Sequence, residues 1–239
     1  MGFFMKPNFK IAVIVFTILL LGCQYRFLDD TRLLVKGDVE NHEGNPIPDA
    51  EIKVYTQRGS GYFLYPAPSY EKFCLGSDFS DTNGDFSVIS LYDQDEDFAI
   101  EIYKNDQYTS YYYTNNTEDY IPDDFTINLG TVTLHPKATF NFKIERTSGL
   151  GNELHYAFEY TSDYCLEVYD KAVLNNQQSQ CYKNEIFSRV LNDDYPNESS
   201  GVNTLLGSSI VFIYSINGQP EEQQIIAVNS VNQEFNFTY

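Results

Sequence analysis

Tryptophan is absent from this chain of 239 residues, histidine occurs three times, and basic side chains are scarce. Lys and Arg together number 15 against 34 Asp and Glu, which gives a formal net charge of -19 at pH 7. Phosphate backbones and anionic membrane surfaces are bound through Lys and Arg. The sequence therefore predicts that nucleic acid is not a partner, and that electrostatic attraction does not hold the protein at an anionic membrane.

The common motifs of catalysis, metal binding and nucleotide binding are also missing. The chain has no HExxH pair, no tandem CxxC, no GxSxG elbow, no Walker A loop and no GxGxxG. His42 falls in an expected turn and His135 at an expected domain junction, and both are predicted to be solvated. Carboxylates are so abundant that adjacent pairs do not point to a glycosidase cleft. We expect a non-catalytic protein without a cofactor; the alternative is an unrecognised hydrolase built from acidic loops.

Residues 1–22 have the organisation of an export signal. Lys6 and Lys10 precede an apolar run of eleven residues, from Ile11 to Leu21, which only Thr17 interrupts. A helix needs about 20 residues to cross the hydrocarbon of a bilayer. The run therefore suits the apolar region of a secretory signal peptide rather than a membrane span.

The signal ends in Leu20-Leu21-Gly22-Cys23, which resembles the lipobox of bacterial lipoproteins. The resemblance implies that the chain is cut before Cys23, and that this cysteine carries the lipid. One acyl chain binds a protein to a membrane only marginally, whereas several acyl chains anchor it stably. The residue after the cysteine is Gln24, whereas an Asp at that position resembles the signal that retains lipoproteins in the inner membrane. We therefore expect a lipid anchor in the outer membrane. The sequence does not determine whether the protein projects into the periplasm or from the cell surface. Residues 23–32 would form the tether; the alternative is an ordinary signal peptide followed by an incidental cysteine.

Three further cysteines, Cys74, Cys165 and Cys181, would lie in an oxidising compartment, where they allow three different single bridges. Fifteen mostly polar residues separate Cys165 from Cys181. A disulfide between these two would close a hairpin-like loop and stabilise the fold by about 3 kcal/mol in the chain-entropy model. The sequence favours this bridge and predicts that Cys74 is a small buried apolar residue.

Alternation of apolar and polar residues, the pattern of half-buried strands, runs through most of the chain. Ile210, Phe212, Tyr214 and Ile216 show it clearly, and the Asn217-Gly218 pair that follows is a hairpin signal. The sequence predicts an all-β protein with two tandem antiparallel β-sandwiches of the immunoglobulin-like or transthyretin-like kind.

The stretch His135-Pro136-Lys137 separates two series of expected strands. It divides the mature chain into a first module, residues 33–135, and a second module of no recognised family, residues 138–239. No internal repeat is visible. Within the second module, the apolar residues of segment 185–191 recur at helical spacing, which is compatible with one short helix.

Four segments of the first module follow one another in an order typical of a known family: VKGDV (35–39), GNPIPDAEIKV (44–54), SDTNGDFSV (80–88) and LGTVTL (129–134). They resemble the carboxypeptidase regulatory-like domain, a transthyretin-like sandwich common in secreted and envelope proteins of Bacteroidetes-type bacteria. The resemblance implies a sandwich without an active site, because the family's motif residues are structural. In relatives the module accompanies an enzyme, a transporter or an adhesin. The stretch from Gly59 to Cys74, rich in Tyr and Pro, departs from the family pattern.

Tyrosine is unusually frequent, with 20 residues. Candidate ligand-binding side chains are Tyr62, Tyr65 and Tyr70 in the lengthened loop, and Tyr111 and Tyr113 on one face of an expected strand. Exposed tyrosines stack on sugars or anchor protein partners, so these residues suggest a glycan or an envelope protein as the ligand. Packing within the core and on the sheet surfaces is the other interpretation, and it is the one that the sequence favours.

Asp93, Asp95 and Asp97 form the densest acidic segment, and hard cations such as calcium bind several carboxylates. The segment is not an EF-hand, because Phe98 stands where glycine is needed and Lys104 where the bidentate Glu belongs. A structural calcium site is one interpretation, and a solvated turn between strands is the other.

Taken together, these features predict a non-catalytic envelope lipoprotein that acts as a binding or scaffold module. The alternative is an accessory subunit of an outer-membrane or periplasmic complex, with residues 138–239 as the docking surface.

Overall fold

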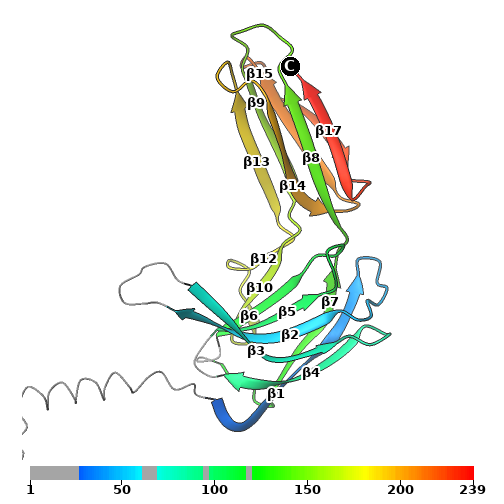
Figure 1. Ribbon diagram of the computed structural model, residues 1–239, viewed down its shortest axis with the longest axis vertical. Coiled ribbons are helices and arrows are strands. Elements are labelled where there is room, and N and C mark those ends of the chain that lie inside the picture. The colour runs from blue at the N-terminus through cyan, green and yellow to red at the C-terminus, as the bar shows by residue number, and fades with distance from the viewer. Residues whose placement is uncertain (1–26, 61–68, 94–96, 117–119) are drawn as a thin grey trace, which may run out of the picture.

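The computed structural model describes residues 27–60, 69–93, 97–116 and 120–239. All the secondary-structure elements in this part of the chain are β-strands. The strands build two sandwiches that follow one another along the molecule (Figure 1). The strands of the second sandwich run along the long axis in this view, whereas those of the first lie across it. The predicted class, an all-β protein with tandem sandwiches, is confirmed.

The first sandwich packs a three-stranded sheet, in the order β4-β1-β7, against a sheet that begins β3-β2-β5-β6. Its strands are β1 (Phe27–Asn41), β2 (Glu51–Ser60), β3 (Ser69–Phe79), β4 (Asp85–Asp93), β5 (Asp97–Tyr103), β6 (Tyr111–Asn116) and β7 (Thr126–Leu134). Alternate residues of each strand enter the core between the sheets, as with Ile52 and Val54 on β2 or Ile100 and Ile102 on β5, all of them fully buried.

Two glycines of the first sandwich stand where no other residue fits. A Cβ atom on Gly37 of β1 would lie 2.6 Å from the carbonyl oxygen of Gly130 on the parallel neighbour β7. Gly84 has a φ of +84°, and a Cβ there would lie 2.4 Å from the carbonyl oxygen of Val39. The turn that leads into β4 therefore depends on a glycine, as the Asn83-Gly84 signal indicated.

The second sandwich packs the sheet β14-β8-β17 against the sheet β13-β9-β15-β16. Its strands are β8 (Lys137–Glu145), β9 (Leu154–Thr161), β13 (Asn184–Leu191), β14 (Glu198–Leu205), β15 (Ser209–Ile216), β16 (Glu222–Ala227) and β17 (Asn232–Thr238). The core is largely aromatic. The Phe158 ring lies 4.6 Å from the Phe142 ring and 4.8 Å from the Phe212 ring, centroid to centroid, and all three side chains are buried.

Both sandwiches have the same topology. If the seven strands of each are counted in chain order, both have one sheet in the order 4-1-7 and another in the order 3-2-5-6. In both, strands 1 and 7 are parallel neighbours, as β1 with β7 and β8 with β17. The sequence shows no repeat, because a strand's place depends on which of its faces is apolar and where turns fall, rather than on residue identity.

A segment between strands 2 and 3 of the second sandwich returns to the first. We call residues 162–183 the insert; it contains β10 (Cys165–Asp170), β11 (Val173–Leu174) and β12 (Gln180–Cys181). β10 pairs in parallel with β6, from Cys165 opposite Tyr111 to Tyr169 opposite Asn115, and so extends the sheet of the first sandwich. The sequence assigned residues 138–239 to the second module, and this assignment is wrong for the insert. The physical reason is that β6 would otherwise be an edge strand with unpaired backbone groups.

Segment 185–191 is a strand, β13, and the short helix is not formed. Phe187 and Leu191 face the core, while Ile186 and Val190 face outward and are 65% and 44% exposed. Because this strand is apolar on both faces, its apolar residues 186, 187, 190 and 191 are separated by one, three and four positions. The same spacing is typical of an amphipathic helix, which is why the sequence pattern was compatible with a helix.

The cysteines divide as the sequence favoured, with one difference. A disulfide joins Cys165 of β10 to Cys181 of β12, and these residues are also direct neighbours in the ladder. Cys74 is a free thiol, as expected, but it is exposed rather than buried. It lies on β3, the edge strand of its sheet, and its Sγ lies 3.6 Å from the Gly76 carbonyl oxygen.

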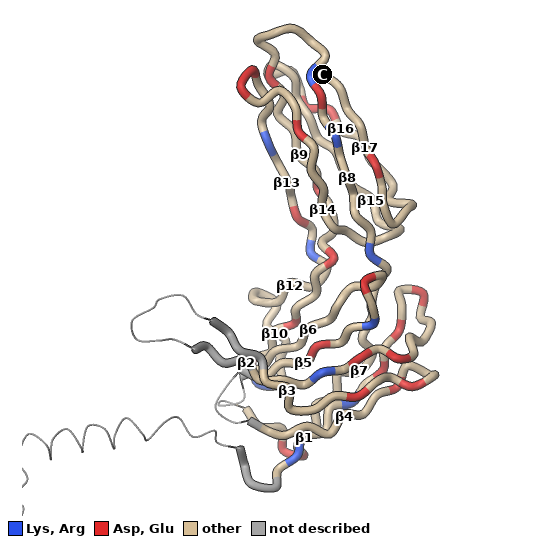
Figure 2. Tube along the Cα trace, viewed as in Figure 1, with Lys and Arg blue, Asp and Glu red and all other residues tan. Residues whose placement is uncertain are grey.

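Acidic side chains are spread over both sandwiches, with few basic side chains between them (Figure 2). Tyrosine hydroxyls often serve as partners for these carboxylates in the part of the chain that is described. The pairs are Tyr103–Asp106, Tyr111–Glu167, Tyr112–Glu101, Tyr156–Glu198, Tyr160–Glu185, Tyr169–Glu167 and Tyr214–Glu222. A composition rich in Tyr and Glu and poor in Lys and Arg thus still satisfies many carboxylates.

Replacing both Cys165 and Cys181 by serine should lower the free energy of unfolding by about 3 kcal/mol, because the sixteen-residue separation is no longer closed in the unfolded chain. Denaturant unfolding of the mature protein measures the change. Cys74→Ser, which removes an exposed thiol outside any bridge, is the matched control and should shift stability by less than about 0.5 kcal/mol. Equal stability of the double variant and the control would contradict a structural role for the disulfide.

Candidate functional site

Tyr111 and Tyr113, predicted as ligand-binding residues, are buried. Their side chains are 6% and 5% exposed and belong to the core of the first sandwich, because β10 covers the edge of β6. Neither residue offers a ring face to a ligand, so their candidacy as ligand-binding residues is corrected; they pack the sheet, which is the interpretation that the sequence favoured.

The Tyr111 hydroxyl instead fastens the insert to the first sandwich. It donates a 2.6 Å hydrogen bond to Glu167 of β10, which also accepts a 3.1 Å bond from Tyr169. Burial, together with the bond to Glu167, raises the pKa of Tyr111 well above its ordinary value. Hydrogen bonds to charged groups contribute about 1.5–3 kcal/mol, so this contact is a substantial part of the attachment.

Tyr113 lines a small hollow at the end of the first sandwich. Its ring centroid lies 4.7 Å from that of Tyr169, and Tyr120 and Lys171 border the same hollow. The volume is about 130 Å³, whereas small-molecule sites usually measure about 300–1,000 Å³. A glycan would not fit into this space.

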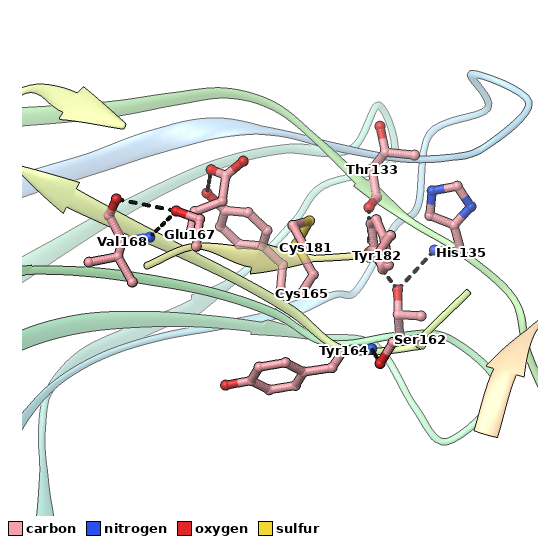
Figure 3. The surroundings of a disulfide bond; sticks show 12 residues. Thr133, His135, Ser162, Tyr164, Cys165, Glu167, Val168, Cys181 and Tyr182 are labelled. Carbon is pink, nitrogen blue, oxygen red and sulfur yellow. Dashed lines mark hydrogen bonds between the residues drawn. A yellow bond between two sulfur atoms is a disulfide. The ribbon is translucent and has the colours of Figure 1, made fainter. Parts of the chain in front are cut away.

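A second group of contacts fastens the other end of the insert (Figure 3). The Tyr182 hydroxyl donates to the Thr133 carbonyl oxygen at 3.1 Å and lies 2.8 Å from the hydroxyl of Thr109, a fully buried residue. The Tyr182 ring meets the imidazole of His135 edge-on, with 4.6 Å between centroids. Burial and the neighbouring His42 lower the pKa of His135, so this histidine is a packed neutral group and not the solvated one that the sequence predicted.

The other predicted site residues lie wholly or partly outside the described residues. Cys23, Tyr62, Tyr65 and Asp95 fall outside them altogether. For Tyr70, Asp93 and Asp97 only the backbone position is described: Tyr70 on β3, Asp93 at the end of β4 and Asp97 at the start of β5. Among the side chains that are described, no group of three His, Cys, Asp or Glu could hold a metal ion.

The second sandwich presents an aliphatic surface to solvent, on the outer face of the sheet β13-β9-β15-β16. We call this surface the outer face. Ladder pairing places Ile186, Glu159, Val211 and Ile225 in one row across the four strands. The next row holds Ser188, Ala157, Ile213 and Gln223. Ile186 and Ile225, which lie on the two edge strands of this sheet, are 65% and 74% exposed.

The corresponding face of the first sandwich serves as an internal comparison. There Lys53 on β2 lies opposite Glu101 on β5, which lies opposite Tyr112 on β6. Lys53 pairs with Glu51 at 2.8 Å, and Tyr112 donates to Glu101 at 3.0 Å. The same position in the same topology is therefore polar in one sandwich and aliphatic in the other, so the fold does not require the exposed aliphatic residues.

A groove of about 320 Å³ runs along one end of the outer face. Val190, Ala157 and Ile213 supply its apolar lining, and His155 and Glu221 supply charged and polar groups. His155 is held by Glu153, with 2.6 Å between Nε2 and Oε1. An apolar centre with a polar rim is the usual composition of a protein-interaction surface.

Sequence reasoning missed the outer face, although a signal was present. Strict alternation fails in Ile186-Phe187, in Ile210-Val211-Phe212-Ile213 and in Ile225-Ile226, where consecutive residues are apolar. In an antiparallel sheet with one solvated face, alternation is expected. Consecutive apolar residues on three of the four strands of this sheet thus indicate that the second face is also apolar.

No family model matches the chain, and no curated protein is significantly similar to it. Among solved structures, it is similar to a 9R-lipoxygenase from Cyanothece PCC8801, with 15% identity and a TM-score of 0.29 over 54% of this chain and 20% of that one. It is also similar to the Bacillus anthracis TIE protein, with 12% identity and a TM-score of 0.30 over 87% and 34%. A third match is the shaft pilin SpaA from Lactobacillus rhamnosus GG, with 9% identity and a TM-score of 0.27 over 87% and 97%.

The chain spans only about a fifth and a third of the first two of these structures. At such TM-scores the matches carry no argument about function. The chain itself defines the class: an all-β protein of two sandwiches with a disulfide, a bond typical of proteins outside the cytoplasm. In the described part of the chain, no helix has the length and apolarity needed to cross a membrane.

His135 makes the stability of the junction depend on pH. Its pKa is lowered in the folded protein, so its contribution is complete above the ordinary histidine pKa of about 6.5 and is lost as the pH falls through the lower folded-state value. The melting temperature should therefore fall between about pH 7 and pH 5, and His135→Gln should make that fall smaller. The wild type, melted over the same pH range, is the reference. Identical slopes for the two proteins would contradict this role of His135.

Proposed function

We propose that this protein is a non-catalytic protein-binding module of the bacterial envelope, anchored by lipid on Cys23, whose partner docks on the outer face of the second sandwich. The observation that carries the proposal is the exposed aliphatic surface around Ile186, Val211 and Ile225. Burial of apolar surface contributes about 25 cal/mol per Å², so a partner that covers these side chains gains affinity from the hydrophobic effect.

The partner's chemistry follows from what surrounds the aliphatic residues. Glu159 lies within the first row, and Glu221 borders the groove. The whole chain carries a net charge of -19. An apolar protein surface that also presents Lys or Arg would be complementary in both respects. An accessory subunit of an envelope complex, docked through the second module, agrees with this arrangement better than a glycan binder based on Tyr111 and Tyr113.

The proposed address is supported by two features. The Leu20-Leu21-Gly22-Cys23 segment resembles a lipobox, and the Cys165–Cys181 disulfide suits an oxidising compartment. We also propose that the first sandwich is related to the carboxypeptidase regulatory-like domain, on the strength of its four matching segments. In this proposal the lipid is inserted in the outer membrane. Protease treatment of intact cells tests on which side of this membrane the sandwiches lie, because only sandwiches on the cell surface would be cleaved.

Replacing Cys23 by serine should abolish incorporation of a labelled fatty acid and release the protein from the membrane fraction, because a serine lacks the thiol that carries the lipid. Metabolic labelling with a palmitate analogue, followed by fractionation, measures both effects. Cys74→Ser, which changes an exposed thiol elsewhere, should leave labelling unchanged. Labelling that persists in the Cys23 variant would contradict the anchor.

A photo-crosslinking side chain at position 190 or 225 should form an adduct of defined mass in intact cells, since both positions lie on the outer face. The matched control is position 53 on the corresponding face of the first sandwich, where the Lys53 side chain is 44% exposed. The double variant Ile186→Glu/Ile225→Glu should lose the partner while its melting temperature stays within about 2 °C. Equal adducts from position 53, or none from positions 190 and 225, would overturn the proposed site.

A further inference from the structure

The edge strand β16 occupies the same place in the second sandwich as β6 in the first. Both are strand 6, at the end of a sheet ordered 3-2-5-6. On β6 this edge is covered by β10, which adds in parallel over five residue pairs. On β16 no further strand is paired within the described part of the chain. The protein therefore contains one occupied and one open copy of the same acceptor position.

The direction of the free backbone groups on β16 follows from its ladder with β15. The Val228 amide donates to the Ser208 carbonyl oxygen, which continues the register in which Ala227 lies opposite Ser209. Alternate residues of an antiparallel strand bond to the same neighbour. Ile226 and Gln224 thus bond to β15, whereas Ala227, Ile225 and Gln223 direct their amide and carbonyl groups outward, away from β15.

β16 also lacks the usual devices that keep an edge strand from pairing. Its sequence, EQQIIA, has no proline and no lysine, and its ladder with β15 runs without a bulge. Natural edges are commonly protected by such features. Ile225, at the centre of the strand, is 74% exposed, so an added strand would cover apolar surface as well as satisfy backbone groups.

We propose that β16 accepts an extended strand of the partner protein, added in parallel as β10 is added to β6; this inference rests on the proposed function and specifies how the partner binds. Residues of the added strand that share a face with Gln223, Ile225 and Ala227 would be aliphatic and would extend the outer face. Residues of the other parity would lie beside Glu222 and Gln224 and would be polar or basic. The partner segment is thus an alternating aliphatic and basic strand.

Amide hydrogen exchange of the full mature protein tests the proposal, with a blocked peptide of sequence KVKITVT as the probe. Saturating peptide should slow exchange of the Gln223, Ile225 and Ala227 amides at least about tenfold, because these amides then donate to the added strand. A spin label on the peptide's amino end should broaden resonances near Glu222 rather than those near Ala227, as parallel addition requires. Unchanged exchange at these three amides, protection at a different edge, or broadening near Ala227 would overturn the proposal.

Gln223→Pro removes one outward amide without removing a bond to β15, and should weaken peptide binding at least about tenfold. Gln223→Ala keeps the amide and is the matched control, which should bind as the wild type does. Ile225→Glu separates the two levels of inference, because it alters the outer face and leaves every amide in place. If Ile225→Glu abolishes crosslinking at position 190 while Gln223→Pro binds normally, side chains alone hold the partner: the proposed function stands and strand addition is overturned.

Discussion

The parallel pairing of β10 with β6 is the interaction on which the arrangement of the two sandwiches depends. It places a loop of the second sandwich inside the sheet of the first, so that the modules share a sheet as well as a linker. The disulfide keeps β10 beside β12, and the hydroxyls of Tyr111 and Tyr182 fasten the insert at both ends. An edge strand that would attract other chains is thereby satisfied within the molecule.

One topology carries two different surfaces in this protein. The 3-2-5-6 sheet of the first sandwich faces solvent with Glu51, Lys53 and Glu101, which form hydrogen bonds among themselves and with a tyrosine. The equivalent sheet of the second sandwich faces solvent with isoleucine and valine, and among the described residues its strand 6 has no added strand of the kind that covers β6. The core requirements are the same in both sandwiches, so folding alone does not account for this difference.

The acidic composition shapes how polar groups are satisfied. With 15 basic side chains against 34 acidic ones, ion pairs cannot neutralise most carboxylates. Tyrosine hydroxyls donate to several of them instead, as in Tyr156 with Glu198 at 2.7 Å. Burial and the neighbouring carboxylate both disfavour the phenolate, and so the pKa of Tyr156 is raised far above its ordinary value. These bonds therefore persist at any pH at which the carboxylates are ionised, which suits a protein with few cations.

The sequence by itself determined the strand class, the bridge between Cys165 and Cys181 and the glycine turn before β4, because alternation, spacing and backbone conformation are local properties. It misplaced the insert, allowed a short helix where β13 forms, and kept Tyr111 and Tyr113 as candidate ligand-binding residues although it favoured their packing. Each of these errors concerns which strand lies beside which. An alternating pattern indicates which residues share one face of a strand. Only the tertiary structure decides whether that face lies against the core or water, and whether the edge of the strand pairs with a neighbouring strand. The order of the strands in the sheet decides both the outer face and the open edge of β16. The sequence does not give this order, because hydrogen bonding between strands is non-local and the register is set by the whole sheet.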